Sequence, residues 1–99
     1  MFRWTTPVVE ISTDISLVDA DVIWLTFAQN DTVLVNKEKP DMTVTAEGIS
    51  VTLTQQETAL FDPYVNLDMQ IRAKFGNFPA IACDIMSASV KDVLKEGEI

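Results

Sequence analysis

The sequence predicts a single all-β domain, an antiparallel sandwich of about seven short strands. Three observations lead to this prediction. Apolar and polar side chains alternate with a period of two in several segments, as in strands with one buried and one solvated face. Turn-forming residues separate these segments, and no helical pattern is long enough to connect parallel strands. We expect one compact unit over residues 1–99, because no linker-like stretch divides the chain.

The first half of the chain contains one clearly alternating segment, DVIWLTFAQ. Its apolar side chains Ile23, Leu25 and Phe27 form the natural core face, which leaves Trp24 and Thr26 on the opposite face. The turn formers Asn30-Asp31 and Lys39-Pro40-Asp41 punctuate the region. Shorter strands are therefore predicted over Val8–Ser12, Thr32–Lys37 and Met42–Thr45.

The second half contains the strongest strand pattern, VNLDMQIRAKF, which begins at Val65. Six apolar residues alternate with five polar ones, so we expect a half-buried, central strand. GISVTLT repeats the pattern after a turn at Gly48, with Ile49, Val51 and Leu53 directed inward. A short strand is predicted over Ala80–Ser87, after the turn residues Gly76-Asn77.

Two segments depart from the strand pattern. Thr54 and Glu57 have the spacing of a capping box, which predicts about one helical turn over QQETALF, ended by Asp62-Pro63. The segment Ser89–Lys95 fits either a second short helical turn or a continued final strand with a frayed tail.

Seven strands with a helical turn before the penultimate strand favour an immunoglobulin-like sandwich. The paired cysteines and the central tryptophan of antibody domains are missing, and Tyr64 is a candidate for the corner tyrosine that some sandwiches use. A small barrel is the alternative.

Composition excludes several classes of function. The formal net charge is −8, with 7 basic residues scattered along the chain, so we expect no nucleic-acid binding. No segment approaches the run of about 18 apolar residues that a spanning helix needs, and the start lacks the pattern of a secretory signal. We therefore expect a soluble protein with no membrane contact.

The sequence also argues against catalysis. It contains no histidine, which removes the common nucleophile–base schemes. Cys83 alternates with Ile81 and Ile85, so we interpret it as a small buried hydrophobe. The acidic residues fall in turns or on polar strand faces and indicate solvated surface; Asp14, Asp19 and Asp21 lack the spacing of a calcium loop. We predict no catalytic residue, no cofactor and no metal site.

The tryptophans are the most informative residues for function. Trp24 lies on the face opposite the predicted core, and Trp4 precedes the first strand, where a terminal arm would lie. Aromatic residues are enriched at the centres of protein interfaces, so we predict a contact surface of Trp24, Thr26 and Trp4, with Gln70 and Arg72 as polar contacts. The alternative is that Trp24 packs in a second layer or under the N-terminal arm. Pairing of sheet edges is a second route to assembly.

Three segments also resemble a known group of proteins: WLTFAQN from Trp24, ISVTLTQQETALF from Ile49 and VNLDMQIRAKF from Val65. In this order and spacing they resemble small proteins from prophages and tailed phages of gram-positive bacteria. More distantly, they resemble the N-terminal immunoglobulin-like domain of phage baseplate upper proteins. The resemblance spans roughly Thr5 to Val93. It implies a tail- or virion-associated module that works by protein–protein contact, in the virion or in the host cytoplasm during assembly, and it transfers no catalytic residues.

The resemblance departs from the baseplate proteins in length, because those continue into a connector and a receptor-binding region. This difference puts direct host recognition in doubt. The function predicted is a non-catalytic structural or assembly module that contacts copies of itself, as a homo-oligomer, or a larger virion protein. A carbohydrate- or cell-surface-binding module is the alternative, and a shallow groove around Trp24 flanked by acids and amides would favour it. A small enzyme or inhibitor is the third interpretation.

Overall fold

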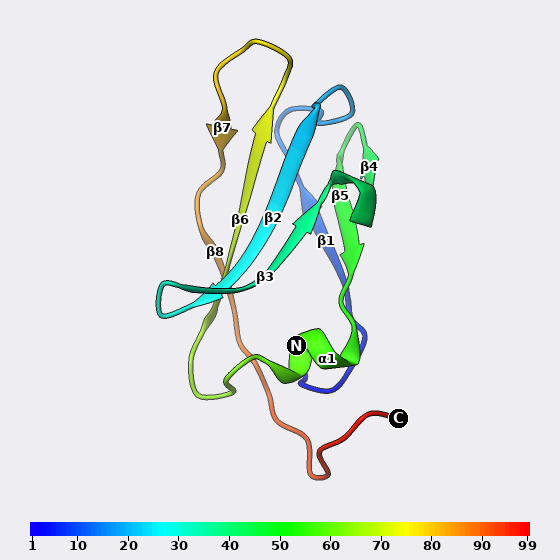
Figure 1. The fold of residues 1–99 in the computed structure, drawn as a ribbon, viewed down its shortest axis with the longest axis vertical. Coiled ribbons are helices and arrows are strands. Elements are labelled where there is room, and N and C mark those ends of the chain that lie inside the picture. Colours follow the sequence, from blue (N-terminus) through cyan, green and yellow to red (C-terminus); the bar gives the residue numbers. More distant parts are fainter.

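The computed structural model describes all residues, 1–99, and contains two antiparallel sheets that face each other (Figure 1). The all-β sandwich predicted from the sequence is confirmed. Eight strands are present because the predicted strand Ala80–Ser87 divides into two. The elements are β1 (Val8–Ser12), β2 (Val22–Gln29), β3 (Thr32–Glu38), a 3₁₀ turn (Lys39–Asp41), β4 (Met42–Thr45), β5 (Gly48–Thr52), α1 (Gln55–Ala59), β6 (Leu67–Lys74), β7 (Ile81–Ala82) and β8 (Met86–Ala88).

The strand order is that of an immunoglobulin-like sandwich without its first strand. The smaller sheet has the order β1-β5-β4, and the larger sheet has the order β3-β2-β6, with β7 and β8 both pairing on the far side of β6. These positions correspond to strands B, E and D in one sheet and to C′, C, F and G in the other. No strand joins the two sheets, so the fold is an open sandwich and not the small barrel considered as the alternative.

The core lies between the sheets and follows the predicted period of two. β2 and β6 contribute alternate side chains that are almost fully buried, and β5 contributes Ile49 and Val51. The rings of Phe27 and Phe61 stack with centroids 6.1 Å apart, which packs the residues after α1 against β2. The inward-facing residues predicted from alternation and found buried are Ile23, Leu25, Phe27, Ile49, Val51, Leu53, Leu67, Met69, Ile71 and Ala73.

The capping box predicted at Thr54 is confirmed. The Thr54 hydroxyl accepts the backbone N–H of Glu57 at 3.1 Å, and the Glu57 carboxylate accepts the backbone N–H of Thr54 at 2.8 Å. Glu57 also forms an ion pair with Lys37 Nζ at 2.9 Å. This ion pair connects α1 to β3, and both of its side chains are largely shielded from solvent.

The corner between α1 and β6 is held by Gln29 and not by Tyr64. The side chain of Gln29 is buried, donates to the carbonyl oxygens of Asp62 (2.8 Å) and Val65 (2.9 Å), and accepts the backbone N–H of Asp62 (2.7 Å). Tyr64 is 93% exposed, so the candidate corner tyrosine is wrong. Tyr64 lies in the turn after Pro63, with its ring in solvent. The side-chain amide of Gln29, at the end of β2, reaches the same corner from the core side.

Cys83 is exposed, which contradicts its prediction as a buried core residue. The chain departs from β6 between β7 and β8. There the sulfur of Cys83 accepts the backbone N–H of Ile71 at 3.2 Å, in place of a ladder carbonyl. Ile81 and Ile85 are exposed too. Ile81 and Cys83 line an open space between the sheets, whereas Ile85 points to the outer face of the larger sheet, so the three residues do not form one buried row.

The segment Ser89–Lys95 forms neither the helical turn nor the strand that were weighed for it. Lys91 instead makes an isolated parallel bridge with Phe2. The guanidinium of Arg3 bonds to Asp92 and Glu96, both at 2.9 Å, and to the carbonyl oxygen of Ala59. The two ends of the chain therefore lie together beside α1, which we call the base of the domain (Figure 1). No helix in the fold combines the length and the apolar character that crossing a bilayer requires.

Candidate functional site

The register of the larger sheet brings four of the five predicted contact residues together. In β2 and β6, Trp24 lies opposite Arg72 and Thr26 lies opposite Gln70. Because side chains alternate along a strand, all four point away from the core on one face. We call this surface the Trp24 face. Its three rows across β3, β2 and β6 are Glu38, Trp24 and Arg72; Asn36, Thr26 and Gln70; and Val33, Ala28 and Asp68.

Trp24 and Arg72 form a stacked pair at one end of this face. The guanidinium carbon of Arg72 lies 5.4 Å from the centroid of the Trp24 ring, within the range of a cation–π contact. Trp24 is 38% exposed, so the alternative in which it packs in a second layer or under the arm is not what the structure shows. Arg72 forms no ion pair. Its guanidinium is always charged, and its N–H donors are free for an outside partner.

The middle row of the Trp24 face is partly bonded within the protein. The Thr26 hydroxyl donates to Asn36 Oδ1 at 2.6 Å, and Gln70 Nε2 donates to the Cys83 carbonyl oxygen at 3.0 Å. A groove of about 510 Å³ runs over these rows and also contacts Asp31 and Ile85. A smaller groove of about 140 Å³ lies on the other side of Trp24. The indole is therefore a ridge between two depressions.

The outer face of the smaller sheet shows the opposite character. A groove there is lined mainly by hydroxyl and carboxylate side chains from β1, β4 and β5, with two apolar residues among nine. The Trp24 face instead exposes Val22, Val33 and Ile85 as well as the indole. The groove on the smaller sheet is thus more polar than the groove beside Trp24.

Trp4 does not join the Trp24 face. It is half-buried at the base of the domain with a positive φ of 58°, beside Thr5, whose N–H donates to Thr58 in α1. Its indole N–H is buried and has no hydrogen-bond partner. Alternation along strands predicts which side a strand residue faces, but it gives no position for a residue in the terminal arm. This is why the expected grouping of the two tryptophans is not found.

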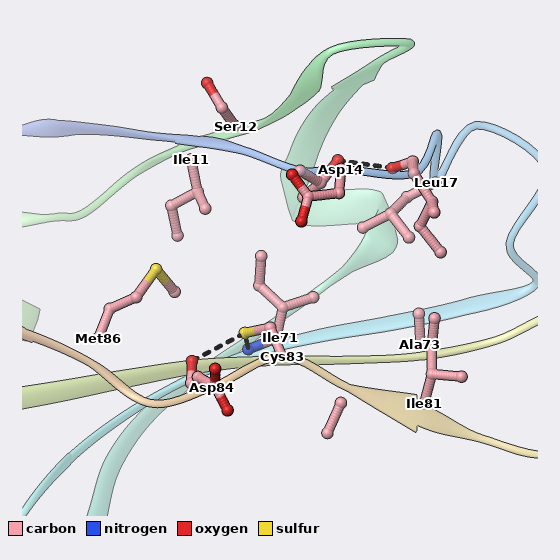
Figure 2. A pocket seen from close by; sticks show the side chains of 13 residues that line it. Ile11, Ser12, Asp14, Leu17, Ile71, Ala73, Ile81, Cys83, Asp84 and Met86 are labelled. Atoms are coloured by element: carbon pink, nitrogen blue, oxygen red, sulfur yellow. Dashed lines mark hydrogen bonds between the residues drawn. The ribbon is translucent and has the colours of Figure 1, made fainter.

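A further concave region, which the sequence did not indicate, lies between the two sheets at the open side of the sandwich. We call it the β1 cleft. It has a volume of about 360 Å³, and nine of its 13 lining residues are hydrophobic. Figure 2 shows Ile11 from β1 directed toward Ile71 and Met86 from the larger sheet, with Cys83 and Asp84 at the lower rim. A strand pattern that lacks the first immunoglobulin strand would have indicated an uncovered edge here.

The titratable groups with shifted pKa values lie outside the grooves beside Trp24 and outside the β1 cleft. The hydrogen bonds that Arg3 donates to Glu96 and Asp92 raise the pKa of Arg3, and hydrogen bonds from the backbone N–H of Val93 and from Arg3 lower the pKa of Asp92. For Glu57, partial burial raises the pKa, but bonds from Lys37 and Thr54 outweigh it and the net shift is downward. All these groups stabilise structure at the base and around α1.

No group of three or more cysteine, aspartate or glutamate side chains is arranged to hold a metal ion. Asp21, one of the aspartates weighed as calcium ligands, accepts the backbone N–H of Gly76 and fixes the turn after β6. The chain was also compared with known proteins, and no protein-family model, curated protein or solved structure matches it.

Proposed function

We propose that this chain is a non-catalytic assembly module that acts by protein–protein contact through the Trp24 face, with a second copy of itself as partner. The observation that carries the proposal is the exposed Trp24–Arg72 stack on an outward sheet face. Tryptophan and arginine are the residues most enriched among those that dominate binding energy at interfaces. A cation without an ion pair beside an indole is an anchor for a partner that supplies a carboxylate.

The charge pattern of the face is self-complementary, which favours a second copy. Asp68 and Arg72 lie on the same face of β6, four residues and therefore roughly 13 Å apart. A two-fold axis in the interface, perpendicular to the strands and through the row of Thr26 and Gln70, would place each Arg72 opposite Asp68 of the second copy. Such reciprocal contact is the rule in two-fold dimers.

The extent of the face predicts weak association. Its three rows supply nine residues, and Val22, Lys74 and Ile85 extend it. Stable interfaces use about 20–30 residues on each side. Each copy also carries a net charge of −8, whose repulsion is screened at physiological salt. We therefore expect a dimer that dissociates on dilution.

Placement in a phage or prophage virion, in the tail or baseplate, is part of the proposal and is supported by the resemblance of the three strand segments. A larger virion protein is then the second partner for the Trp24 face. The absence of histidine from the chain supports the non-catalytic part of the proposal.

A carbohydrate- or cell-surface-binding module is the second candidate. The groove beside Trp24 favours it, because acids and amides line the groove, as a sugar site requires. Against it, the Arg72 guanidinium stacks on the indole ring on which a sugar would stack, and Gln70 already bonds to Cys83. The geometry therefore supports the protein partner better.

Light scattering after size-exclusion chromatography, over a concentration series at physiological salt, tests the proposal. The wild type should shift from monomer to dimer as concentration rises, and Trp24→Ala should stay monomeric. Arg72→Asp and Asp68→Arg should each weaken the dimer, whereas the double exchange should restore it. Thr43→Ala, on the polar outer face of the smaller sheet, is the matched control.

A wild type that stays monomeric at every concentration, with the same elution as Trp24→Ala, would exclude self-association through this face. In that case, NMR titration of the labelled protein with oligosaccharides decides the second candidate. Shifts at the Trp24 indole N–H that vanish in Thr26→Ala and Gln70→Ala would then assign the groove to sugar.

A further inference from the structure

The outer edge of β1 has free backbone hydrogen-bonding groups. Thr13 donates to the Glu47 carbonyl oxygen at 2.9 Å, and Leu53 donates to the Pro7 carbonyl oxygen at 3.0 Å. In an antiparallel pair such bonds recur at every second residue, so Val9 and Ile11 bond toward β5. The N–H and C=O groups of Val8, Glu10 and Ser12 therefore point to the other side, where no strand pairs.

The free edge of β1 borders the apolar β1 cleft. Across the cleft lie β7 and β8, which are not hydrogen-bonded to β1. The side chain of Ile11 extends from β1 into the gap, toward Ile71 and Met86 (Figure 2). An apolar groove beside a row of unpaired backbone groups is the arrangement into which an extended peptide adds as a further strand.

The other sheet edges are protected from such addition, and β1 is not. The opposite edge of the cleft is broken at Cys83, between β7 and β8. The register between β2 and the edge strand β3 shifts at Phe27 and Ala28, and β4 is only four residues long and follows a 3₁₀ turn. Bulges and short strands are the usual means of blocking edge pairing. β1 keeps a regular register over all five of its residues.

We propose that the β1 cleft accepts an extended basic segment of a partner protein, which pairs with β1 as an added strand. Alternate apolar side chains of the segment fill the cleft. Because side chains alternate along a strand, its lysines or arginines lie on the outer face, beside the exposed Glu10 of β1. The groove on that face is lined by Glu10 and Glu47 and by no basic side chain. The site is separate from the Trp24 face, so this inference goes beyond the proposed function.

A second copy of the chain does not fit this edge. Antiparallel pairing of β1 with its own copy about its middle residue would set Glu10 opposite Glu10. Like charges directly opposite each other destabilise a strand pair. The carboxylate of Glu10 at the centre of this edge therefore selects a basic, heterologous segment.

The test uses the full chain, labelled with ¹⁵N, and the capped peptide KVTVKVTVK as probe. We expect hydrogen exchange at the amides of Val8, Glu10 and Ser12 to slow at least tenfold on saturation. The amides of Val9 and Ile11, already bonded to β5, serve as internal controls and should not change. A peptide with glutamate in place of each lysine, and one with alternate backbone nitrogens methylated, should both fail to protect the edge.

Glu10→Pro is the decisive variant. The N–H that it removes is not used within the sheet, and proline is tolerated at such edge positions, so the fold should persist while peptide binding is lost. Tenfold protection of the three edge amides that disappears in Glu10→Pro supports the proposal. Absence of protection, equal binding of the glutamate peptide, or binding retained by Glu10→Pro would overturn it. None of these results depends on whether Trp24 supports a dimer.

Discussion

Replacing Gln29 with leucine should destabilise the domain by about 3 kcal/mol, because one buried side chain makes three hydrogen bonds to the corner between α1 and β6. Each bond contributes about 1 kcal/mol net. Leucine has a similar size, so the loss reports the bonds and not a cavity. For a domain of this size, about 3 kcal/mol corresponds to a fall in Tm of roughly 12–24 °C.

Urea unfolding followed by circular dichroism measures this loss as a lower midpoint at constant slope. Two variants serve as controls. Tyr64→Ala should change stability by less than about 0.5 kcal/mol, since its side chain is almost fully exposed. Gln70→Leu removes a single bond at the surface and should cost about 1 kcal/mol or less. A loss below about 1 kcal/mol for Gln29→Leu, or a larger loss for Tyr64→Ala, would refute the assignment of the tether to Gln29.

Three further outcomes are expected. Removing the Lys37–Glu57 ion pair with Glu57→Gln should cost about 1 kcal/mol at neutral pH. The folded pKa of Glu57 is lowered, so its contribution to stability is complete above the ordinary value of 4.5 and is lost as the pH falls through the folded pKa. Urea titrations of the wild type and of Glu57→Gln should therefore give the same stability in acid. A difference that stays constant with pH would contradict this. Gly48→Ala should cost about 2–3 kcal/mol in the same assay, because the new methyl would lie 2.1 Å from the Ile11 carbonyl oxygen. Cys83 should react with a disulfide reagent in the folded protein without denaturant, and labelling only after unfolding would show that it is buried after all.

The architecture could be predicted because most strands are half-buried. The alternation around Ile71 and around Leu25 assigned each side chain to the core or to solvent, and the structure follows it. Trp24 faces outward for the same reason. The capping box of α1 was predictable because both partners lie three residues apart in the chain. Local chemistry and a fixed period were sufficient for these features.

The remaining features depend on contacts between distant parts of the chain. Alternation at Cys83 indicates two faces but not whether anything covers one of them, and here Cys83 is exposed and lines an open cleft. The role of Gln29 depends on Asp62, 33 positions away. The position of Trp4 depends on how the arm meets α1. The β1 cleft required knowledge of which strand is missing, and no single segment carries that information.

The contacts of Arg3 have a consequence for the order in which the chain folds. Its guanidinium bonds to side chains 89 and 93 positions away, so these contacts close nearly the whole chain into a loop. Loop closure of this length is entropically unfavourable until the sheets between its ends have formed. The base should therefore assemble last, and the ends should open and close many times during the lifetime of one folded molecule, well before β2 and β6 separate.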